Sequence, residues 1–379
     1  MHICFVTHEY PKKGYAHGGI GSFVKTIASE LVQNGVRVSV IGTNYTTKDE
    51  FSVENGVHLY RLRKRKLKGF TWWLNTNAIS RKIAEIHRLH PISIVETSEL
   101  GLAFLDKIPA VKYVVRLHGG HHFFSEAENR TINWWKGFQE KKSFRKADAF
   151  VAVSDYVKTH TAKYLSYQGK TVVNISNPVN TAMFRPLAVE IVPHSIIFAG
   201  TVCEKKGIRQ LIQAFPSIKK DFPAATLEVY GRDWFFSDGS SYLKMLQQTE
   251  LPKIGALASD IHFHGAVDHT HLPEIYGRAQ VCVFPSHMET QGLVAPEAML
   301  MEKVVVFTEK GPGPETIVHR QTGLLCDPHD PQSIADQVKW VFSNPDQLTK
   351  MEKNAREAAL CKYSLLKIAE KNLSFYRSL

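Results

Sequence analysis

The chain has 379 residues, enough for about two domains that each bury a hydrophobic core. Hydrophobic residues make up 44% and charged residues 22%, which are ordinary globular values and exclude a disordered or fibrous chain. No apolar run approaches the roughly 18 residues needed to cross a bilayer. The formal net charge of +11 indicates an anionic partner: a nucleic acid, an anionic lipid or a phosphorylated substrate.

Cysteine and histidine placement argues against disulfide and metal frameworks. The five cysteines are scattered without a CxxC pair: Cys4, Cys203, Cys282, Cys326 and Cys361. The densest histidine cluster, His118, His121 and His122, lacks the spacing of a helical HExxH site, so we expect no metal there. At the N-terminus the polar His8 and Glu9 arrive too soon for a signal peptide, which favours a cytoplasmic protein.

A βαβ unit is predicted at the start of the chain. Residues 2–7 and 36–41 read as strands, and the helix between them opens on the glycines of GGIGSF. Gly18, Gly19 and Gly21 fit a phosphate-binding turn, although plain turn geometry is the alternative. The loop is longer than a dinucleotide fingerprint and lacks GxGxxG, which disfavours a nicotinamide dehydrogenase.

The alternation of apolar runs and amphipathic segments continues along the chain and predicts an α/β fold. Further strands are expected at residues 92–97, 113–117, 149–153, 172–175, 195–199, 226–230, 261–265, 280–284 and 304–307. Residues 186–193 read as a linker, 333–342 and 347–361 as surface helices, and 364–376 as an amphipathic final segment. No internal repeat is visible.

Two windows combine basic and aromatic residues. Arg61–Trp73, RLRKRKLKGFTWW, is the most basic, and Trp134–Lys146, WWKGFQEKKSFRK, is similar. Cations beside aromatic rings suit an anionic membrane surface, so we expect such a surface as a partner through Arg61–Trp73. A solvated strand end and loop is the alternative. No recognised RNA or DNA motif accompanies the windows, and nucleic acid is not expected.

The most informative stretch is Pro285–Met301, PSHMETQGLVAPEAMLM. It follows a predicted buried strand, and we expect its helix to start at Gly292 and to end near Lys303. A helix that starts at the carboxyl edge of a parallel sheet favours an anionic ligand. Glu289 and Glu297 flank the glycine-containing turn, an arrangement that suits a nucleotide-sugar, with hydroxyls at both ends and phosphate in the middle. The alternative is a loop charge and a carboxylate that complements the helix dipole.

The motif ETQGLVAPEAM resembles the Glu-x7-Glu signature of retaining glycosyltransferases of the GT4 type, which have the GT-B fold. The resemblance implies that Glu289 binds hydroxyls of the donor sugar and that Glu297 binds the ribose. It further implies that the amides of Gln291, Gly292 and Leu293 bind the sugar and the diphosphate.

The first half of the chain also resembles this family. Its glycine loop corresponds to Gly18, Gly19 and Gly21, which would meet the donor phosphate and the acceptor. His118, at a predicted strand end before two glycines, matches a histidine that approaches the donor sugar and supports the transferring centre. The segment ISNPVNTAMFRP is similar to one at the end of the family's first domain, with Pro178 in place of a glycine.

In the second half, GTVCEKKG resembles the diphosphate clamp of the family. Lys206 matches its lysine, but Thr201 occupies the position of an arginine, so Lys205 or another basic residue would have to substitute. The backbone near residues 263–266 would hold the base. Arg232 and Asp233 replace a more usual glycine-acid pair, and KGPGPE matches a further motif in the expected order.

Together these features predict a GT-B fold of two Rossmann-like domains facing across a cleft. We place the acceptor domain at residues 1–186, the nucleotide-sugar domain at 187–362, and a helix returning to the first domain at 363–379. The reaction implied is retaining, metal-independent sugar transfer to a glycan or lipid-linked acceptor in cell-surface polysaccharide or glycolipid synthesis, in the cytoplasm or at the cytoplasmic membrane face. A UDP-sugar is the donor most expected, as substrate and not as cofactor.

Two rival functional classes remain open. One is another GT-B enzyme, such as a nucleotide-sugar epimerase or an inverting transferase, for which the Glu-x7-Glu motif is unexpected. The other is a non-catalytic protein that binds nucleotide-sugars or a membrane surface, which the replacement of arginine by Thr201 favours.

Overall fold

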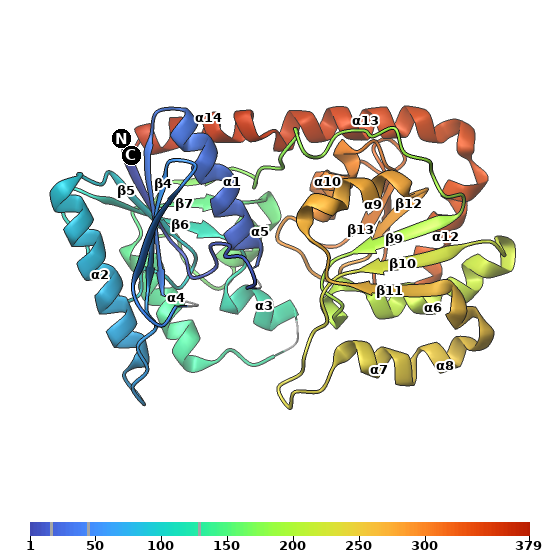
Figure 1. Cartoon of the computed structure of the whole chain (residues 1–379), viewed down its shortest axis with the longest axis horizontal. Helices are drawn as coiled ribbons and strands as arrows, with labels where there is room; N and C mark the ends of the chain where they lie inside the picture. Colours follow the sequence, from blue (N-terminus) through green and yellow to red (C-terminus); the bar gives the residue numbers. More distant parts are fainter. Residues whose placement is uncertain (16–17, 44–45, 128–129) are drawn as a thin grey trace. The chain divides into compact units, whose positions relative to one another are not determined.

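The computed structural model describes residues 1–15, 18–43, 46–127 and 130–379, and the chain forms two compact units (Figure 1). The first unit comprises Met1–Pro178 and Leu365–Leu379, and the second comprises Val179–Ser364. The domain limits expected from the sequence lie after residues 186 and 362. Among the described residues, no helix is long and apolar enough to cross a membrane.

The first unit is built on one sheet whose described strands run in the order β3-β4-β2-β1-β5-β6-β7-β8. These are β1 (His2–Val6), β2 (Arg37–Thr43), β3 (Glu50–Glu54), β4 (Val57–Leu62), β5 (Ile94–Thr97), β6 (Lys112–Leu117), β7 (Ala149–Ala152) and β8 (Val172–Asn174). Every pairing is parallel except that of the edge strand β3 with β4. The carboxyl ends of the parallel strands therefore meet at one edge.

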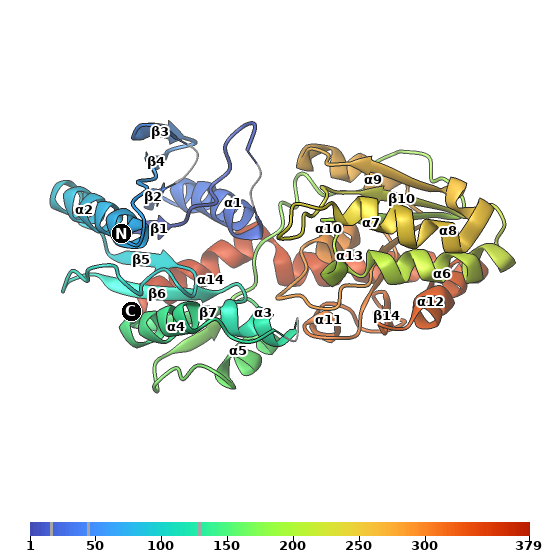
Figure 2. The same ribbon diagram turned by 90° about the horizontal axis from the view of Figure 1, so that it is seen from below.

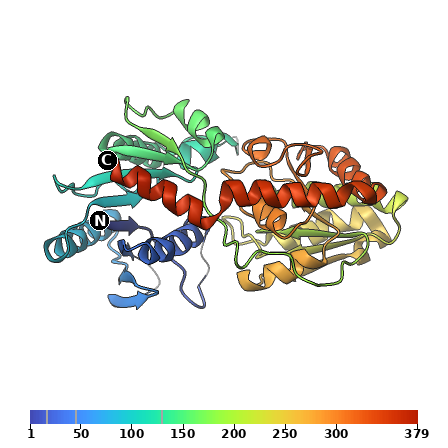
Figure 3. The ribbon, with the colours of Figure 1, turned by 90° about the horizontal axis from the view of Figure 1, so that it is seen from above.

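Helices cover both faces of this sheet (Figure 2). They are α1 (Gly19–Gln33), α2 (Thr71–Leu89), α3 (His121–Ala127), α4 (Trp134–Lys146), α5 (Asp155–Ala162) and α14 (Leu365–Arg377). Phe23, Val24, Ile27 and Leu31 recur at helical spacing on α1 and lie buried against the sheet. Helix α14 lies against α1, although most of the chain separates them in sequence (Figure 3).

A buried ion pair joins α14 to the first sheet. Arg116 of β6 donates from Nε to Oε1 of Glu96 on β5 at 2.7 Å, and both side chains are at least 98% buried. The same guanidinium donates to Oδ1 of Asn372 at 2.5 Å, and the Tyr376 hydroxyl donates to Glu96 Oε2 at 2.6 Å. The guanidinium carbon also lies 4.5 Å from the ring centroid of Phe23. Strands β5 and β6 and helices α1 and α14 therefore all contact one buried ion pair.

The second unit contains an all-parallel sheet in the order β11-β10-β9-β12-β13-β14 among the residues described. Its strands are β9 (Ser195–Ala199), β10 (Thr226–Tyr230), β11 (Ile261–Gly265), β12 (Val281–Phe284), β13 (Val305–Thr308) and β14 (Leu324–Cys326). Its helices are α6 (Ile208–Asp221), α7 (Tyr242–Thr249), α8 (Leu251–Ile254), α9 (Leu272–Arg278), α10 (Val294–Leu300), α11 (Gly313–Thr316), α12 (Pro331–Ser343) and α13 (Pro345–Tyr363).

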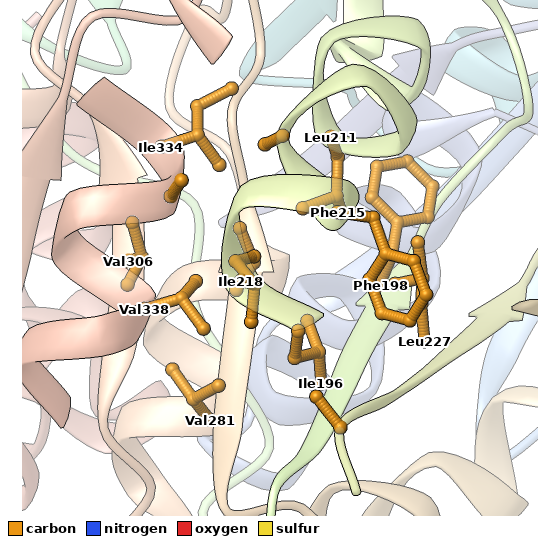
Figure 4. Close-up of a cluster of buried hydrophobic side chains, with 14 of the residues drawn as sticks. Ile196, Phe198, Leu211, Phe215, Ile218, Leu227, Val281, Val306, Ile334 and Val338 are labelled. Carbon is orange, nitrogen blue, oxygen red and sulfur yellow. The ribbon is translucent and has the colours of Figure 1, made fainter. Parts of the chain in front are cut away.

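One face of the second sheet packs against α6 and α12 (Figure 4). Leu211, Phe215 and Ile218 of α6 recur at helical spacing and meet Ile334 and Val338 of α12 over the strands. The opposite face is covered by a second apolar cluster that includes residues of α9, α10 and α13. Both faces of the strands are therefore buried, which explains why they read as continuous apolar runs in the sequence.

The predicted α/β architecture with parallel sheets is confirmed, and several elements differ in detail. No element was predicted for the β3-β4 hairpin or for α2. In β3, Phe51 and Val53 are exposed, so the strand lacks a buried apolar run. Helix α10 begins at Val294 and not at Gly292, because Gly292 has φ +76° and forms a turn. It ends at Leu300, because Glu302 has φ +55° and stops the helix.

The buried pair generates a stability prediction. Arg116→Met leaves the Glu96 carboxylate buried beside a neutral group, so we expect the free energy of unfolding to fall by about 3–5 kcal/mol. Chemical denaturation followed by circular dichroism measures it. The exposed control Arg145→Met is expected to change stability by less than about 0.5 kcal/mol. The double variant Arg116→Met with Glu96→Leu lacks the unpaired charge and should regain part of the lost free energy of unfolding. Equal stability of the wild type and Arg116→Met would contradict a stabilising role for Arg116.

Candidate functional site

The turn after β12 lies at the carboxyl edge of the second sheet. It contains Glu289 and Gln291, both more than 90% buried, and leads through Gly292 into α10. Leu293 is the residue that precedes the first turn of α10, and it is half-buried. Pro296 and Glu297 still fall within the first four residues of the helix, where a proline removes no helical hydrogen bond. These residues lie at the entrance of a helix, as predicted, but the helix begins two residues later than expected.

Lys206 and Glu289 form an ion pair between Nζ and Oε1. Lys206 lies at the end of a short 3-10 segment, Glu204–Lys206, which follows β9, and Glu289 follows β12. Gly207 comes next, with φ +71°, and a Cβ there would lie 1.9 Å from the carbonyl oxygen of Pro285. Only glycine permits this approach, which brings the lysine loop against the turn that carries Glu289.

Further contacts join the lysine loop to the turn that carries Glu289, and we call this part of the second unit the Lys206–Glu289 corner. The amide of His287 donates to the carbonyl oxygen of Lys205 at 2.9 Å, so the two loops are joined through backbone as well as through side chains. At the Thr201 position, Arg232 donates from Nε to Oγ1 at 3.5 Å. Arg232 comes from the loop after β10, next to the loop after β9, since Val202 N–H donates to its carbonyl oxygen at 2.9 Å. A cation therefore lies beside the threonine, supplied by a different strand end.

Glu297 is 5% exposed and has two side-chain partners. Nε2 of His269 lies 2.9 Å from Oε1, and the Tyr276 hydroxyl donates to Oε2 at 3.5 Å. Burial and the charge of Glu297 raise the pKa of Tyr276 well above its usual value, so its phenol remains a donor. His269 is more than half exposed, which leaves the Oε1 side of the carboxylate approachable from solvent once this imidazole moves.

The stretch expected to hold the base lies at the end of β11. His264 stacks on Tyr230 of β10 with ring centroids 4.3 Å apart and an interplanar angle of 10°. Glu228 accepts from both His262 and His264, at 2.9 and 2.6 Å. These side-chain contacts join the edge strand β11 to its neighbour β10 around residues 263–266.

The glycine loop lies at the carboxyl edge of the first sheet. A Cβ at Gly21 would lie 1.9 Å from the carbonyl oxygen of Glu9, and one at Gly18 would lie 2.4 Å from Oε2 of the same residue. Gly19 has open space around it. Gly21 is therefore required for the start of α1 to approach the Glu9 backbone, whereas at Gly18 the neighbouring atom belongs to the flexible Glu9 side chain. The sequence motifs did not single out Glu9.

His118 follows β6 and is half-buried. Its ring centroid lies 5.3 Å from that of Phe23, and the Phe23 ring also contacts the Arg116 guanidinium. Burial, together with the charge of Arg116, lowers the pKa of the His118 imidazole to about 3. The histidine is therefore neutral at physiological pH and offers one donor and one acceptor nitrogen.

Two buried glutamates hold the loop that follows His118. Glu140 of α4, fully buried, accepts from the backbone N–H groups of His121 and His122 and binds Nδ1 of His122. Glu99 is 3% exposed and lies near Glu140 and the backbone of His118 and Gly119. Burial, with the neighbouring Glu140 charge, raises the pKa of Glu99 to about 8, so it is protonated at neutral pH.

Each unit brings together some of the site residues predicted from the sequence. In the second unit, Lys206 contacts Glu289, whereas Glu297 has separate partners.

The sequence did not indicate four further residues at these sites. They are Arg232 beside Thr201, His269 beside Glu297, and Glu99 and Glu140 beside the loop that follows His118. Only spatial proximity identifies them. In the described parts of the chain, no group of three or more histidine, cysteine or carboxylate side chains could hold a metal ion.

Relatives with similar sequences include glycosyltransferases. The chain is 28% identical to an uncharacterized glycosyltransferase of Methanocaldococcus jannaschii over 100% of this chain and 98% of that protein. It is 22% identical to a GDP-mannose-dependent alpha-(1-6)-phosphatidylinositol monomannoside mannosyltransferase of Mycobacterium tuberculosis, over 99% and 98% of the two chains.

Solved structures show the same fold. Sucrose-phosphate synthase from Thermosynechococcus elongatus matches with a TM-score of 0.84 at 19% identity, over 100% of this chain and 98% of that one. Anabaena HepE in complex with UDP and glucose matches with a TM-score of 0.79 at 17% identity, over the whole of both chains. The predicted GT-B fold class is confirmed.

Two family models divide the chain between them. Residues 17–183 match Glycosyltransferase Family 4, and residues 187–358 match Glycosyl transferases group 1. The matches follow the same order as the motifs that carried the resemblance, with the Glu-x7-Glu turn in the second. The chain belongs to the GT4-type, group 1 family of glycosyltransferases.

Proposed function

We propose that this glycosyltransferase moves a sugar from a nucleotide-diphosphate donor to a glycan or lipid-linked acceptor, with retention at the anomeric carbon and without a metal ion. The acceptor would belong to cell-surface polysaccharide or glycolipid synthesis. The observation that carries the donor assignment is the corner of the second unit where Lys206 pairs with Glu289 beside the entrance to α10.

The chemistry proposed for this corner is charge stabilisation. When the bond from the sugar to the diphosphate breaks, negative charge develops on the leaving phosphate oxygen, and Lys206 would be the cation that stabilises it. Arg232, held at Thr201, and Lys205 would supply further positive charge to the diphosphate. Glu289, once released from Lys206, would accept from sugar hydroxyls, and Glu297 from the ribose after His269 moves aside.

Retention and metal independence rest on the family resemblance and on this charge supply. Lysine and backbone N–H groups can carry the charge of a diphosphate without a metal ion. The first unit would contribute the neutral His118 imidazole beside the transferring centre, with Gly18, Gly19 and Gly21 at the donor phosphate and acceptor. A front-face displacement, with the leaving phosphate assisting removal of the acceptor proton, fits this set of residues.

The donor is proposed to be a UDP-sugar. The bound UDP of Anabaena HepE supports this choice, whereas the mycobacterial relative is GDP-mannose-dependent. That relative is also named for phosphatidylinositol monomannoside, a glycolipid, which supports the proposal of a lipid-linked acceptor here. The basic loop, Arg63–Lys68, is largely exposed and would face an anionic membrane. Arg61, which opens the window predicted to meet the membrane, is buried and donates to the Pro11 carbonyl oxygen instead.

The first test is donor binding. A nucleotide-sugar at 100 times its dissociation constant should stabilise the wild type by about 2.7 kcal/mol, measurable as a thermal shift with UDP-, GDP- and ADP-sugars. Glu297→Gln loses a charged hydrogen bond to the ribose, worth about 1.5–3 kcal/mol, and should bind the same donor at least about tenfold more weakly. Glu274→Gln, an exposed carboxylate on α9, is the matched control. Absence of a shift with every nucleotide-sugar, together with binding to anionic vesicles, would favour the non-catalytic alternative.

Turnover tests the role of Lys206. Lys206→Met removes the cation at the leaving phosphate, so kcat should fall about 10²–10³-fold in an assay of nucleoside diphosphate release. Lys220→Met, an exposed lysine at the end of α6, should behave as wild type. Nuclear magnetic resonance of the product should show the anomeric configuration of the donor. Inversion would exclude retention, and an unchanged kcat in Lys206→Met would exclude the lysine from catalysis.

The raised pKa of Glu99 predicts a pH-dependent stability. The pKa of this carboxyl is near its ordinary value of 4.5 in the unfolded chain and about 8 in the folded protein, so the folded protein binds the extra proton between these values. Stability should therefore fall by about 1.4 kcal/mol per pH unit in this window from this group. The Glu99→Gln side chain cannot ionise. Its free energy of unfolding in urea, relative to that of the wild type, should therefore increase from pH 5 to pH 8. A constant difference across this range would show that Glu99 is ionised in the folded protein.

A further inference from the structure

A cavity of about 320 Å³ lies at the carboxyl edge of the first sheet, within the first unit. Its lining contains two kinds of side chain. Thr7, His8, Glu9, Thr97 and Ser98 are polar, whereas Trp72, Ile79, Leu100, Phe104 and Leu105 are apolar. A pocket of this composition suits a ligand that carries hydroxyl groups on one part and hydrocarbon on another.

Aromatic rings lead from this cavity to the surface. Trp72 and Phe104 line the cavity with ring centroids 4.3 Å apart, and Trp72 meets Trp135 at 5.5 Å. Trp135 stacks on Phe138 at 5.8 Å, and Phe138 stacks on Trp134 at 6.0 Å. Trp134 is 77% exposed. These five residues form what we call the aromatic ridge, an apolar surface that extends beyond the width of one sugar ring.

The ridge depends on contacts between distant segments. Trp72 lies in the first turn of α2, and Trp134 and Trp135 open α4, on the same face of the sheet (Figure 2). The two basic and aromatic windows of the sequence therefore meet in space. Solvent-exposed tryptophan is unusual for a surface without a partner, and a contiguous group of rings marks a binding surface.

Positive charge flanks the ridge. Asn75 of α2 binds both the N–H and the carbonyl oxygen of Arg65, at 2.9 and 3.0 Å, and fixes the basic loop beside the start of the helix. Nζ of Lys142 lies 4.2 Å from the ring centroid of Phe104. Cations placed next to an apolar track fit a phosphate group joined to a hydrocarbon chain.

We propose that the aromatic ridge binds the hydrocarbon chain of a lipid-linked acceptor while the adjoining cavity holds its hydroxyl-bearing head. This assignment rests on the proposed function and narrows its acceptor class from glycans in general to amphiphiles with an anionic linkage. Glu9 and Thr97 are the polar lining groups placed to bind the head. Lys142 and the basic loop are placed to bind the linkage.

The test measures how affinity depends on chain length. Methyl, hexyl and octyl β-glucosides, each below its micelle concentration, are titrated into the full-length protein by calorimetry. Each buried methylene contributes about 0.8 kcal/mol, so affinity should rise up to about fourfold per methylene. The double variant Trp134→Ala with Phe138→Ala should reduce the rise to about twofold or less per methylene. Both residues are on the surface, so the fold should persist, and the melting temperature checks it.

Phe51→Ala, an exposed aromatic residue on β3, is the matched control and should keep the wild-type dependence. A wild type without chain-length dependence overturns the proposal, even if UDP-sugars bind. A dependence that the double variant keeps overturns it as well, because the chain then binds elsewhere. Chain-length dependence in a protein that binds no nucleotide-sugar overturns the acceptor assignment and the proposed function together.

Vesicles separate the acceptor chain from the bulk membrane. Phosphatidylcholine vesicles with and without phosphatidylglycerol are sedimented with wild type and the double variant. If the double variant loses vesicle binding while soluble glucosides show no chain-length dependence in the wild type, the ridge docks on the bilayer and the proposal is wrong. If wild-type glucoside binding depends on the ridge without any vesicle, the proposal is supported.

Discussion

The Arg116–Glu96 pair is the interaction on which the first unit depends. A buried guanidinium is tolerated only when nearby oxygens satisfy its donors, and here they come from β5 and from α14. The pair therefore fixes the last helix of the chain against its first sheet. The same cation packs on Phe23, and its charge adds to the effect of burial in lowering the pKa of His118, two residues further along. The Arg116 charge therefore affects both the packing of α14 and the protonation state of His118, a candidate catalytic group.

Parallel sheets explain why so much of the site could be located from the sequence. In such sheets every loop that follows a strand emerges at the same edge, so motifs read one after another along the chain converge in space. The GGIG loop and His118 follow β1 and β6, and the EKKG loop and Glu-x7-Glu turn follow β9 and β12. Because buried strands are continuous apolar runs, their ends could be placed within a few residues without knowledge of the sheet order.

Partners could not be predicted in the same way, because they depend on which loops become neighbours. Nothing in the local sequence indicates that His269 meets Glu297, or that Arg232 lies beside Thr201. The basic windows show the same limit. Their composition indicated a binding surface, but Arg61 turned inward to Pro11, and only the packing of α2 on α4 joined Trp72 to Trp135. Helix α10 was placed two residues early because its glycine adopts a left-handed turn.

If Lys206 and Glu289 bind the donor as proposed, their ion pair would also affect donor selectivity. A diphosphate that takes Lys206 replaces one ion pair with another, so the net gain is small unless Glu289 also finds a new partner. A free nucleoside diphosphate lacks the transferred sugar and its hydroxyls, so it would leave the mostly buried Glu289 carboxylate without its cation. A complete nucleotide-sugar satisfies both groups at once. Under the proposed function, the resting ion pair would therefore favour the intact donor over the nucleotide product, and its re-formation after transfer would assist product release.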